Sequence, residues 1–157
     1  MSSPSTAENL NGLCKEIQQL DNSIRFVGIA NNLGTLIATA YRNGLTPLMN
    51  EQETSHYAIQ SVLRAATRED FESKIGKLEY SIGKYEGIIR ATVPIRLFGS
   101  NDDDNNNQSK FYYLLISFDL KSAVIDIIED KVMPFVEKNR ENFVWVVSHN
   151  RYLIDNN

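Results

Sequence analysis

The chain has 157 residues, with 16 basic and 20 acidic side chains and a formal net charge of −4. This length suits one domain with a sizeable core, and the acidic balance argues against a protein held to nucleic acid by phosphate neutralisation. A single cysteine excludes an intrachain disulfide. Because no apolar run could span a bilayer and the first residues lack the features of a signal peptide, we expect a cytoplasmic protein.

A first helix is predicted over residues 6–20. Ser5 and Glu8 have the spacing of a capping box, and apolar side chains recur behind them at helical intervals. Cys14 lies beside the apolar stripe, while Lys15 falls on another side of the helix. A reactive thiol needs a nearby base or cation, so we interpret Cys14 as a structural residue.

A β-hairpin is predicted next, with strands over 24–30 and 35–41. Between them stands Asn31-Asn32-Leu33-Gly34, and both Asn and Gly tolerate the positive φ angles of a tight turn. Neither strand alternates cleanly between apolar and polar residues, which predicts a sheet covered by helices on both faces.

A second helix is predicted after a loop over 41–49. It begins near Asn50 or Glu51 and reaches Phe71 or Lys74. Its apolar stripe has small residues that suit close packing on a flat surface; the stripe comprises Tyr57, Ala58, Val62, Ala65 and Ala66, broadened by Ile59 and Leu63.

A second hairpin is predicted from strands over 77–83 and 88–95. In the first strand, Leu78, Tyr80 and Ile82 are expected on one side. Basic residues gather here beside Tyr80 and Tyr85, namely Lys74, Lys77, Lys84, Arg90 and Arg96. They suggest a surface for an anion or a partner, but interleaved acids favour the plainer interpretation of a solvated strand face.

The segment 99–109 has no apolar residue, so we expect a mobile loop between strands. The nearly continuous apolar run 111–118 then predicts a central strand buried on both faces. A third helix over 120–138 is expected to pack across that strand, with Pro134 kinking its last turn. The β-prone run 143–147 adds a possible edge strand.

The predicted order is α-β-β-α-β-β-β-α, which gives an α/β (α+β) fold: a three-layer α/β/α domain with a five-stranded antiparallel sheet. This order resembles the roadblock, longin and profilin-like domains. The segment 27–38 is similar to the first hairpin of roadblock domains, because an apolar strand, a polar turn ending in Gly34 and a second apolar strand follow one another. The whole sequence also resembles uncharacterised small proteins of ammonia-oxidising archaea, which imply no activity. We expect a loose N-terminus over 1–5, one domain over 6–148 and a loose tail over 149–157.

No residue pattern predicts catalysis, a metal site or a cofactor. Glu53 and His56 share a helix face but are too few for a metal site, and His149 is remote from them in sequence. The acidic stretch 102–107 lacks the spacing of a calcium loop, and no glycine-rich phosphate loop is present.

Two functions stay open. Roadblock-type domains homodimerise and act as scaffolds or regulators of small GTPases and motors, so that resemblance implies a non-catalytic interaction module. Profilin-like domains bind small metabolites, which implies a sensory domain with a cavity beneath the loop 41–50. For the first function we predict a homodimer interface on the second helix and the edge strand, comprising Tyr57, Leu78, Tyr80 and Ile82.

Overall fold

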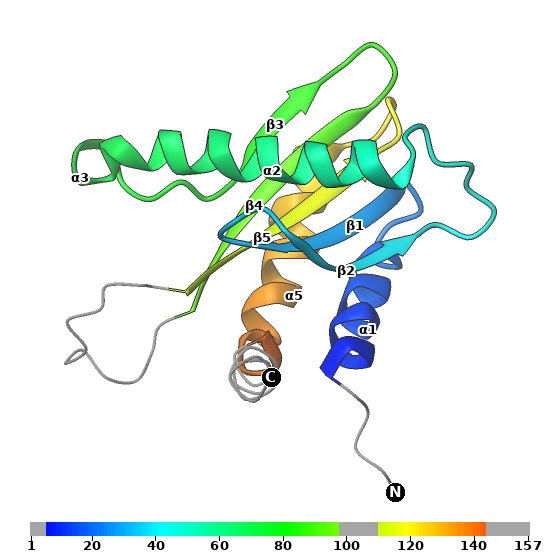
Figure 1. Cartoon of the computed structure of the whole chain (residues 1–157), viewed down its shortest axis with the longest axis horizontal. Helices are drawn as coiled ribbons and strands as arrows, with labels where there is room; N and C mark the ends of the chain where they lie inside the picture. Colours follow the sequence, from blue (N-terminus) through cyan, green and yellow to red (C-terminus); the bar gives the residue numbers. More distant parts are fainter. Residues whose placement is uncertain (1–5, 98–109, 144–157) are drawn as a thin grey trace, which may run out of the picture.

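The computed structural model describes residues 6–97 and 110–143, and residues 1–5, 98–109 and 144–157 lie outside this description (Figure 1). Its first half contains α1 (Thr6–Gln18), β1 (Ile24–Asn31), β2 (Leu36–Tyr41), α2 (Glu51–Arg68), η1 (Glu69–Phe71) and α3 (Glu72–Ile75). Its second half contains β3 (Ser81–Lys84), β4 (Ile89–Leu97), β5 (Lys110–Phe118), α4 (Val124–Ile127), η2 (Ile128–Val132) and α5 (Met133–Lys138).

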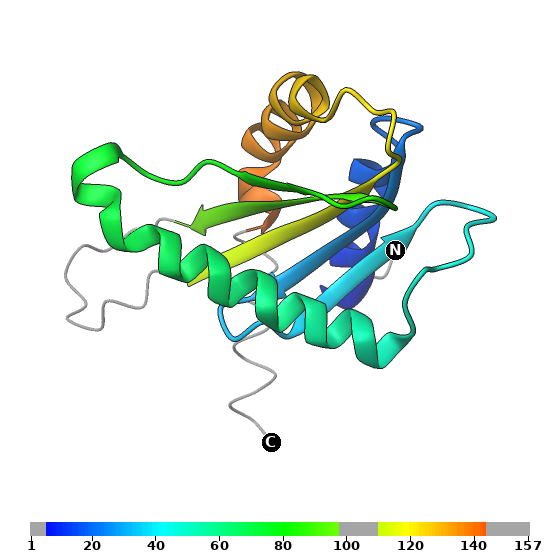
Figure 2. The same cartoon turned by 90° about the horizontal axis from the view of Figure 1, so that it is seen from above.

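The five strands form one antiparallel sheet in the order β2-β1-β5-β4-β3. Helix α2 crosses one face, while α1 and the helix formed by α4, η2 and α5 cover the other (Figure 2). The predicted fold class is therefore confirmed, including the central position of β5.

Both faces of β5 are buried, and each belongs to a different core. Leu114, Ile116 and Phe118 pack in the larger core beneath α1 and the C-terminal helix. Tyr113 and Leu115 pack in the smaller core beneath α2. Alternate side chains of a strand point to opposite faces, so one apolar strand supplies both cores.

The turn between β1 and β2 follows the sequence prediction. Asn31 Oδ1 accepts hydrogen bonds from the backbone N–H groups of Leu33 and Thr35, both at 3.0 Å, and Gly34 has φ +83°. A Cβ at Gly34 would lie 2.6 Å from the Cα of Ile59. Glycine therefore permits both the turn and the close approach of α2 to it.

The C-terminal helix begins later than predicted, at Val124 instead of Leu120, because residues 119–123 form a turn in which Ser122 Oγ donates to the Asp119 carbonyl at 2.7 Å. Its middle is the π-helical turn η2, which precedes Pro134 by two residues. Proline has no N–H and its ring crowds the carbonyl four residues earlier, so a wider turn here accommodates it.

The possible strand over 143–147 is not formed at its first residue. Residues 140–143 are helical, and Phe143 is buried in the larger core. Three predicted segments lie outside the described residues: the rest of this strand over 144–147, the loop over 99–109 and the tail over 149–157. Residue 143 is helical because burying the Phe143 side chain in the core stabilises the fold more than the local strand preference would.

Shortening a buried side chain in either core should lower the free energy of unfolding. Leu115 and Ile128 are fully buried on opposite sides of the sheet. Leu115→Ala or Ile128→Ala should each lower the free energy of unfolding by about 2–5 kcal/mol in urea denaturation. Ile125→Ala, at an exposed position of α4, is the matched control and should cost much less. Equal effects of Ile125→Ala and Ile128→Ala would contradict the placement of this helix.

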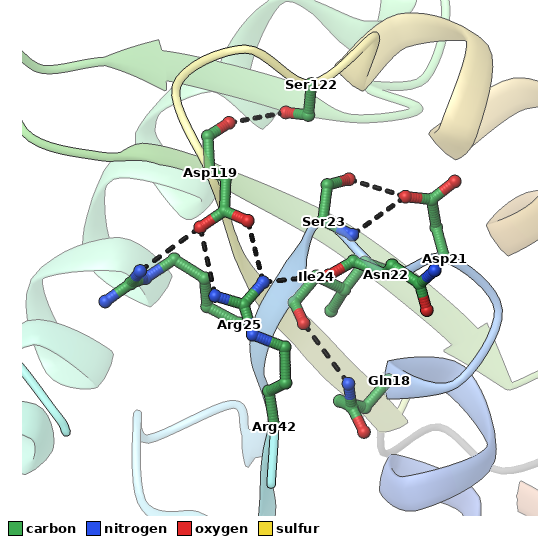
Figure 3. Close-up of polar contacts among 9 residues, drawn as sticks. All are labelled: Gln18, Asp21, Asn22, Ser23, Ile24, Arg25, Arg42, Asp119 and Ser122. Atoms are coloured by element: carbon green, nitrogen blue, oxygen red, sulfur yellow. Dashed lines mark hydrogen bonds and ion pairs between the residues drawn. The ribbon is translucent and has the colours of Figure 1, made fainter. Parts of the chain in front are cut away.

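An ion pair between the α1–β1 turn and η2 predicts acid sensitivity. Lys131 Nζ lies 2.8 Å from Asp21 Oδ2, and Ser23 donates two hydrogen bonds to Oδ1 (Figure 3). Lys131, then Ser23, lower the pKa of Asp21 from 3.8 to about 2. Because folding lowers the pKa of Asp21, its ionised carboxylate stabilises the folded state at pH values above the pKa of the unfolded chain. This contribution is lost as the pH falls from about 4 to about 2.

Asp21→Asn should thus lower the free energy of unfolding at pH 7 by about 1 kcal/mol, a figure discounted for solvent screening. The difference from the wild-type chain should shrink toward pH 2. Urea titrations at several pH values measure it, and a difference that stays constant down to pH 2 would refute the pair as its cause.

Candidate functional site

The four residues predicted to form an interface do not share one surface. Tyr57 is 8% exposed and faces the sheet from α2. Leu78 packs at the margin of the smaller core, whereas Tyr80 packs at the larger core and donates a 2.6 Å hydrogen bond to Glu129 Oε1. Ile82 is 37% exposed.

The expected alternation of Leu78, Tyr80 and Ile82 is wrong at Leu78. Residues 76–80 precede the first ladder pair of β3, which joins Ser81 to Thr92. Without ladder hydrogen bonds this segment does not follow the pleat, so Leu78 and Tyr80 reach opposite faces of the sheet.

Strand β3 forms one edge of the sheet. It pairs only with β4 among the described strands, so its outer backbone groups have no strand beside them. The opposite edge, β2, is partly capped because Asn11 of α1 accepts a hydrogen bond from the Thr39 N–H at 3.2 Å. Beside β3, Ile82, Leu120 and Ile125 are exposed apolar side chains around a shallow hollow against α4. We call these three residues the β3 patch.

The outward side of α2 carries a second apolar surface that the sequence analysis missed. Ile59 and Leu63 were expected to widen the buried stripe, but Leu63 is 61% exposed and Ile59 is exposed as well. Leu33 is exposed on the adjacent β1–β2 turn. We call Leu33, Ile59 and Leu63 the α2 patch. The sequence did contain a signal for this exposure. Ile59 and Leu63 are four residues apart, so they share a helix face, and that face is rotated away from the centre of the buried stripe at Ala58, Val62 and Ala65.

A small cleft lies beneath the segment 42–50, where the sequence led us to expect a ligand cavity. Its floor is a row across the sheet, Tyr41, Phe26, Ser117 and Arg90, which the strand register sets side by side. The other lining residues come from β1, the segment after β2, the first turns of α2 and the residue before β4, namely Arg25, Leu45, Pro47, Leu48, Met49, Thr54, Tyr57 and Ile88. The space open to water is about 40 Å³.

Arg90 lines this cleft, and none of the described carboxylates pairs with it. Its guanidinium carbon lies 3.7 Å from the centre of the Tyr57 ring and 5.6 Å from that of Tyr85. One terminal nitrogen donates to Met49 Sδ at 3.1 Å, and Nε is buried with no hydrogen-bond partner. Burial raises the pKa of Tyr57, so its neutral ring presents a π face to the cation.

Asp119 pairs with Arg25, which lines the cleft, and with Arg42 (Figure 3). It follows β5 and receives Arg25 from β1 at 3.2 Å and Arg42 from the end of β2 at 2.7 and 3.2 Å. Arg42, and then Arg25, hold the pKa of Asp119 below its usual range. Two guanidinium groups on one carboxylate leave a net positive charge at this end of the sheet.

The other predicted candidates show no assembled chemistry. Burial raises the pKa of Cys14 to about 12, which makes it a poor nucleophile and confirms its structural role. His56 is exposed and close only to Gln60 among its hydrogen-bonding neighbours. Within residues 6–97 and 110–143, no group of three His, Cys, Asp or Glu side chains could hold a metal ion. None of the described helices has the length and hydrophobicity to cross a membrane.

Solved structures with the same architecture identify the fold. The gliding protein MglB of Thermus thermophilus superposes with a TM-score of 0.64 at 10% identity, covering 95% of this chain and 96% of that one. An MglB with a tetrameric arrangement gives 0.65 at 11% identity, covering 95% of each chain. The Roadblock/LC7 domain of Streptomyces avermitilis gives 0.59 at 8% identity, covering 86% of this chain and 98% of that one.

The chain has a roadblock-type fold. The predicted resemblance to roadblock domains is thereby confirmed at the level of architecture, since identities this low show the fold alone. No protein-family model matches the sequence, and no curated protein matches it.

The Asp119 cluster predicts a measurable effect on the roadblock-type domain. Asp119→Asn removes the charge that holds Arg42, and the Leu45 N–H, which donates to the Arg42 carbonyl at 3.1 Å, should exchange faster. We expect an increase of up to about fivefold in native-state hydrogen exchange, corresponding to about 1 kcal/mol. Asp126→Asn, at an exposed site on α4, is the control. Equal exchange in both variants would show that Asp119 does not hold this segment.

Proposed function

We propose that this chain is a non-catalytic interaction and regulatory module of roadblock type that works as a homodimer. The observation that carries the proposal is the sheet edge at β3, beside which no second described strand lies, together with the exposed β3 patch. An exposed strand edge pairs readily with another strand, and pairing with its own copy about a two-fold axis removes the edge from both.

The α2 patch supplies the second part of the proposed surface. Ile59 and Leu63 stand on the solvent side of a helix whose inner side already fills the smaller core. Exposed large apolar side chains on a helix are typical of surfaces that bind another protein. We assign this patch to the second copy or to a regulatory partner, for which small GTPases are the first candidates because roadblock-type domains act on them.

The alternative function, a sensory domain that binds a metabolite, has weaker support. The expected cleft beneath 41–50 is present, but its open space of about 40 Å³ is far below the several hundred Å³ of ordinary ligand pockets. A whole metabolite does not fit in this cleft without movement of the segment that covers it. A larger hollow of about 600 Å³ also borders Pro47, Met49 and Asn50, and it lies along the edge strand β2.

Light scattering after size exclusion at tens of micromolar tests the dimer. The wild-type chain should elute with twice the monomer mass, and Ile82→Lys should return it to the monomer because two buried lysines would face each other across the axis. Gln19→Lys, at an exposed position directly after α1, adds the same charge elsewhere and should leave the dimer intact.

Leu63→Lys separates the two surfaces. If α2 belongs to the dimer interface, this variant becomes monomeric too, whereas retention of the dimer assigns the α2 patch to another partner. A wild-type monomer at this concentration would refute the proposed homodimer.

A further inference from the structure

The cleft beneath the segment 42–50 contains an uncompensated cation. The described ion pairs give carboxylate partners to Arg25, Arg42, Arg96, Lys131 and Arg140. None of the described carboxylates lies within 4.0 Å of Arg90, although its Nε is buried. Removing part of a guanidinium from water without an anion is unfavourable, and such an unsatisfied group in a native structure calls for an explanation.

The charges around the cleft indicate that a group bound there would be negatively charged. Arg90 and Arg25 both line it, and among its described lining residues there is no Asp or Glu. Among the described carboxylates Asp119 alone pairs with Arg25, and it is shared with Arg42. In a chain of net charge −4, this is a local positive site that favours an anion.

The shape and lining of the cleft select a carboxylate on a short apolar stem. A space of about 40 Å³ admits the tip of such a group but not a larger body. The planar guanidinium of Arg90 matches the two oxygens of a carboxylate. Phe26, Leu45 and Met49 give the cleft an apolar lining that suits methylene groups.

The mouth of the cleft indicates that the carboxylate belongs to a polypeptide. Leu48 and Tyr41 line the cleft and remain exposed, and the exposed Tyr85 ring has its centre 5.6 Å from the Arg90 guanidinium carbon. A small free acid would contact none of these residues beyond the cleft, yet it would lose its full translational freedom on binding. An acidic residue flanked by apolar neighbours would contact both the cleft and its rim.

From this geometry we propose that the cleft is a binding site for an acidic side chain of a partner polypeptide, with Arg90 as the residue that pairs with its carboxylate. This site is separate from the β3 and α2 patches, so it goes beyond the proposed dimer. The Tyr57 ring holds the Arg90 guanidinium in the cleft, and Asp119 holds Arg25, a second cation in its lining.

Titration of the ¹⁵N-labelled full chain with sodium propionate tests the carboxylate site. The Arg90 Nε–H resonance and the amides near Tyr57 should shift and saturate, whereas sodium chloride at equal ionic strength should not reproduce these shifts. Arg90→Gln should weaken the binding by about tenfold or more, as expected for loss of a charged hydrogen bond. Arg64→Gln, at an exposed arginine of α2, is the matched control and should bind like the wild-type chain.

Saturating shifts that persist in Arg90→Gln, or shifts equal to those from chloride, would overturn the site. If Arg90→Gln does not fold, the wild-type chain still decides the question through nuclear Overhauser contacts from the propionate methyl group to Leu48 and Tyr57. Their absence at saturation would overturn the proposal as well.

A titration with a peptide tests whether the carboxylate belongs to a polypeptide or to a small free acid. N-acetyl-Leu-Glu-Leu-amide should bind about tenfold more tightly than propionate because its leucines reach the exposed rim, and the Gln analogue should lose this binding. Equal affinity of peptide and propionate would overturn the assignment to a polypeptide. Both titrations are readable on a monomer or a dimer, so failure of the proposed homodimer does not affect them.

Discussion

The structure depends on a central strand that has to be covered on both faces. β5 is apolar along almost its whole length, so neither of its faces can remain in water. Helix α2 covers one face, while α1 and the C-terminal helix cover the other, and β1 and β4 occupy its two edges. This demand fixes the order of the three layers and leaves β2 and β3 at the outside.

The end of the same strand organises the cleft. Directly after β5, Asp119 draws in one arginine from β1 and one from the end of β2, which anchors the point where the segment 42–50 leaves the sheet. The row of side chains that forms the floor comes from four strands in register. Arg90 therefore meets Tyr57 and Met49 as a consequence of how the sheet, the covering segment and α2 assemble around β5.

The proposed surfaces differ in what they offer a partner. The β3 edge provides backbone hydrogen-bonding groups, and the α2 patch provides apolar area, so both suit association with a folded protein. The cleft provides one cation in an apolar setting and suits a single acidic side chain. The cleft and the two patches are formed by different residues, so the two proposals do not exclude each other.

The sequence by itself determined the features that depend on local pattern. Alternation and helical spacing predicted the strands and helices in order, Asn31 and Gly34 predicted the first turn, and the apolar run before Asp119 predicted the central strand. Only the tertiary structure decided where half-buried side chains point. Leu78 faces α2 because the segment before β3 lacks ladder bonds, and Ile59 and Leu63 face water because the sheet beneath α2 is already filled. The sequence placed Arg90 on a solvated basic face. Only the tertiary structure shows that Tyr57 and Met49 contact it and that no described carboxylate pairs with it. Burial and ion pairing depend on residues that are distant in the sequence, so the hydrophobic periodicity of a segment cannot predict them.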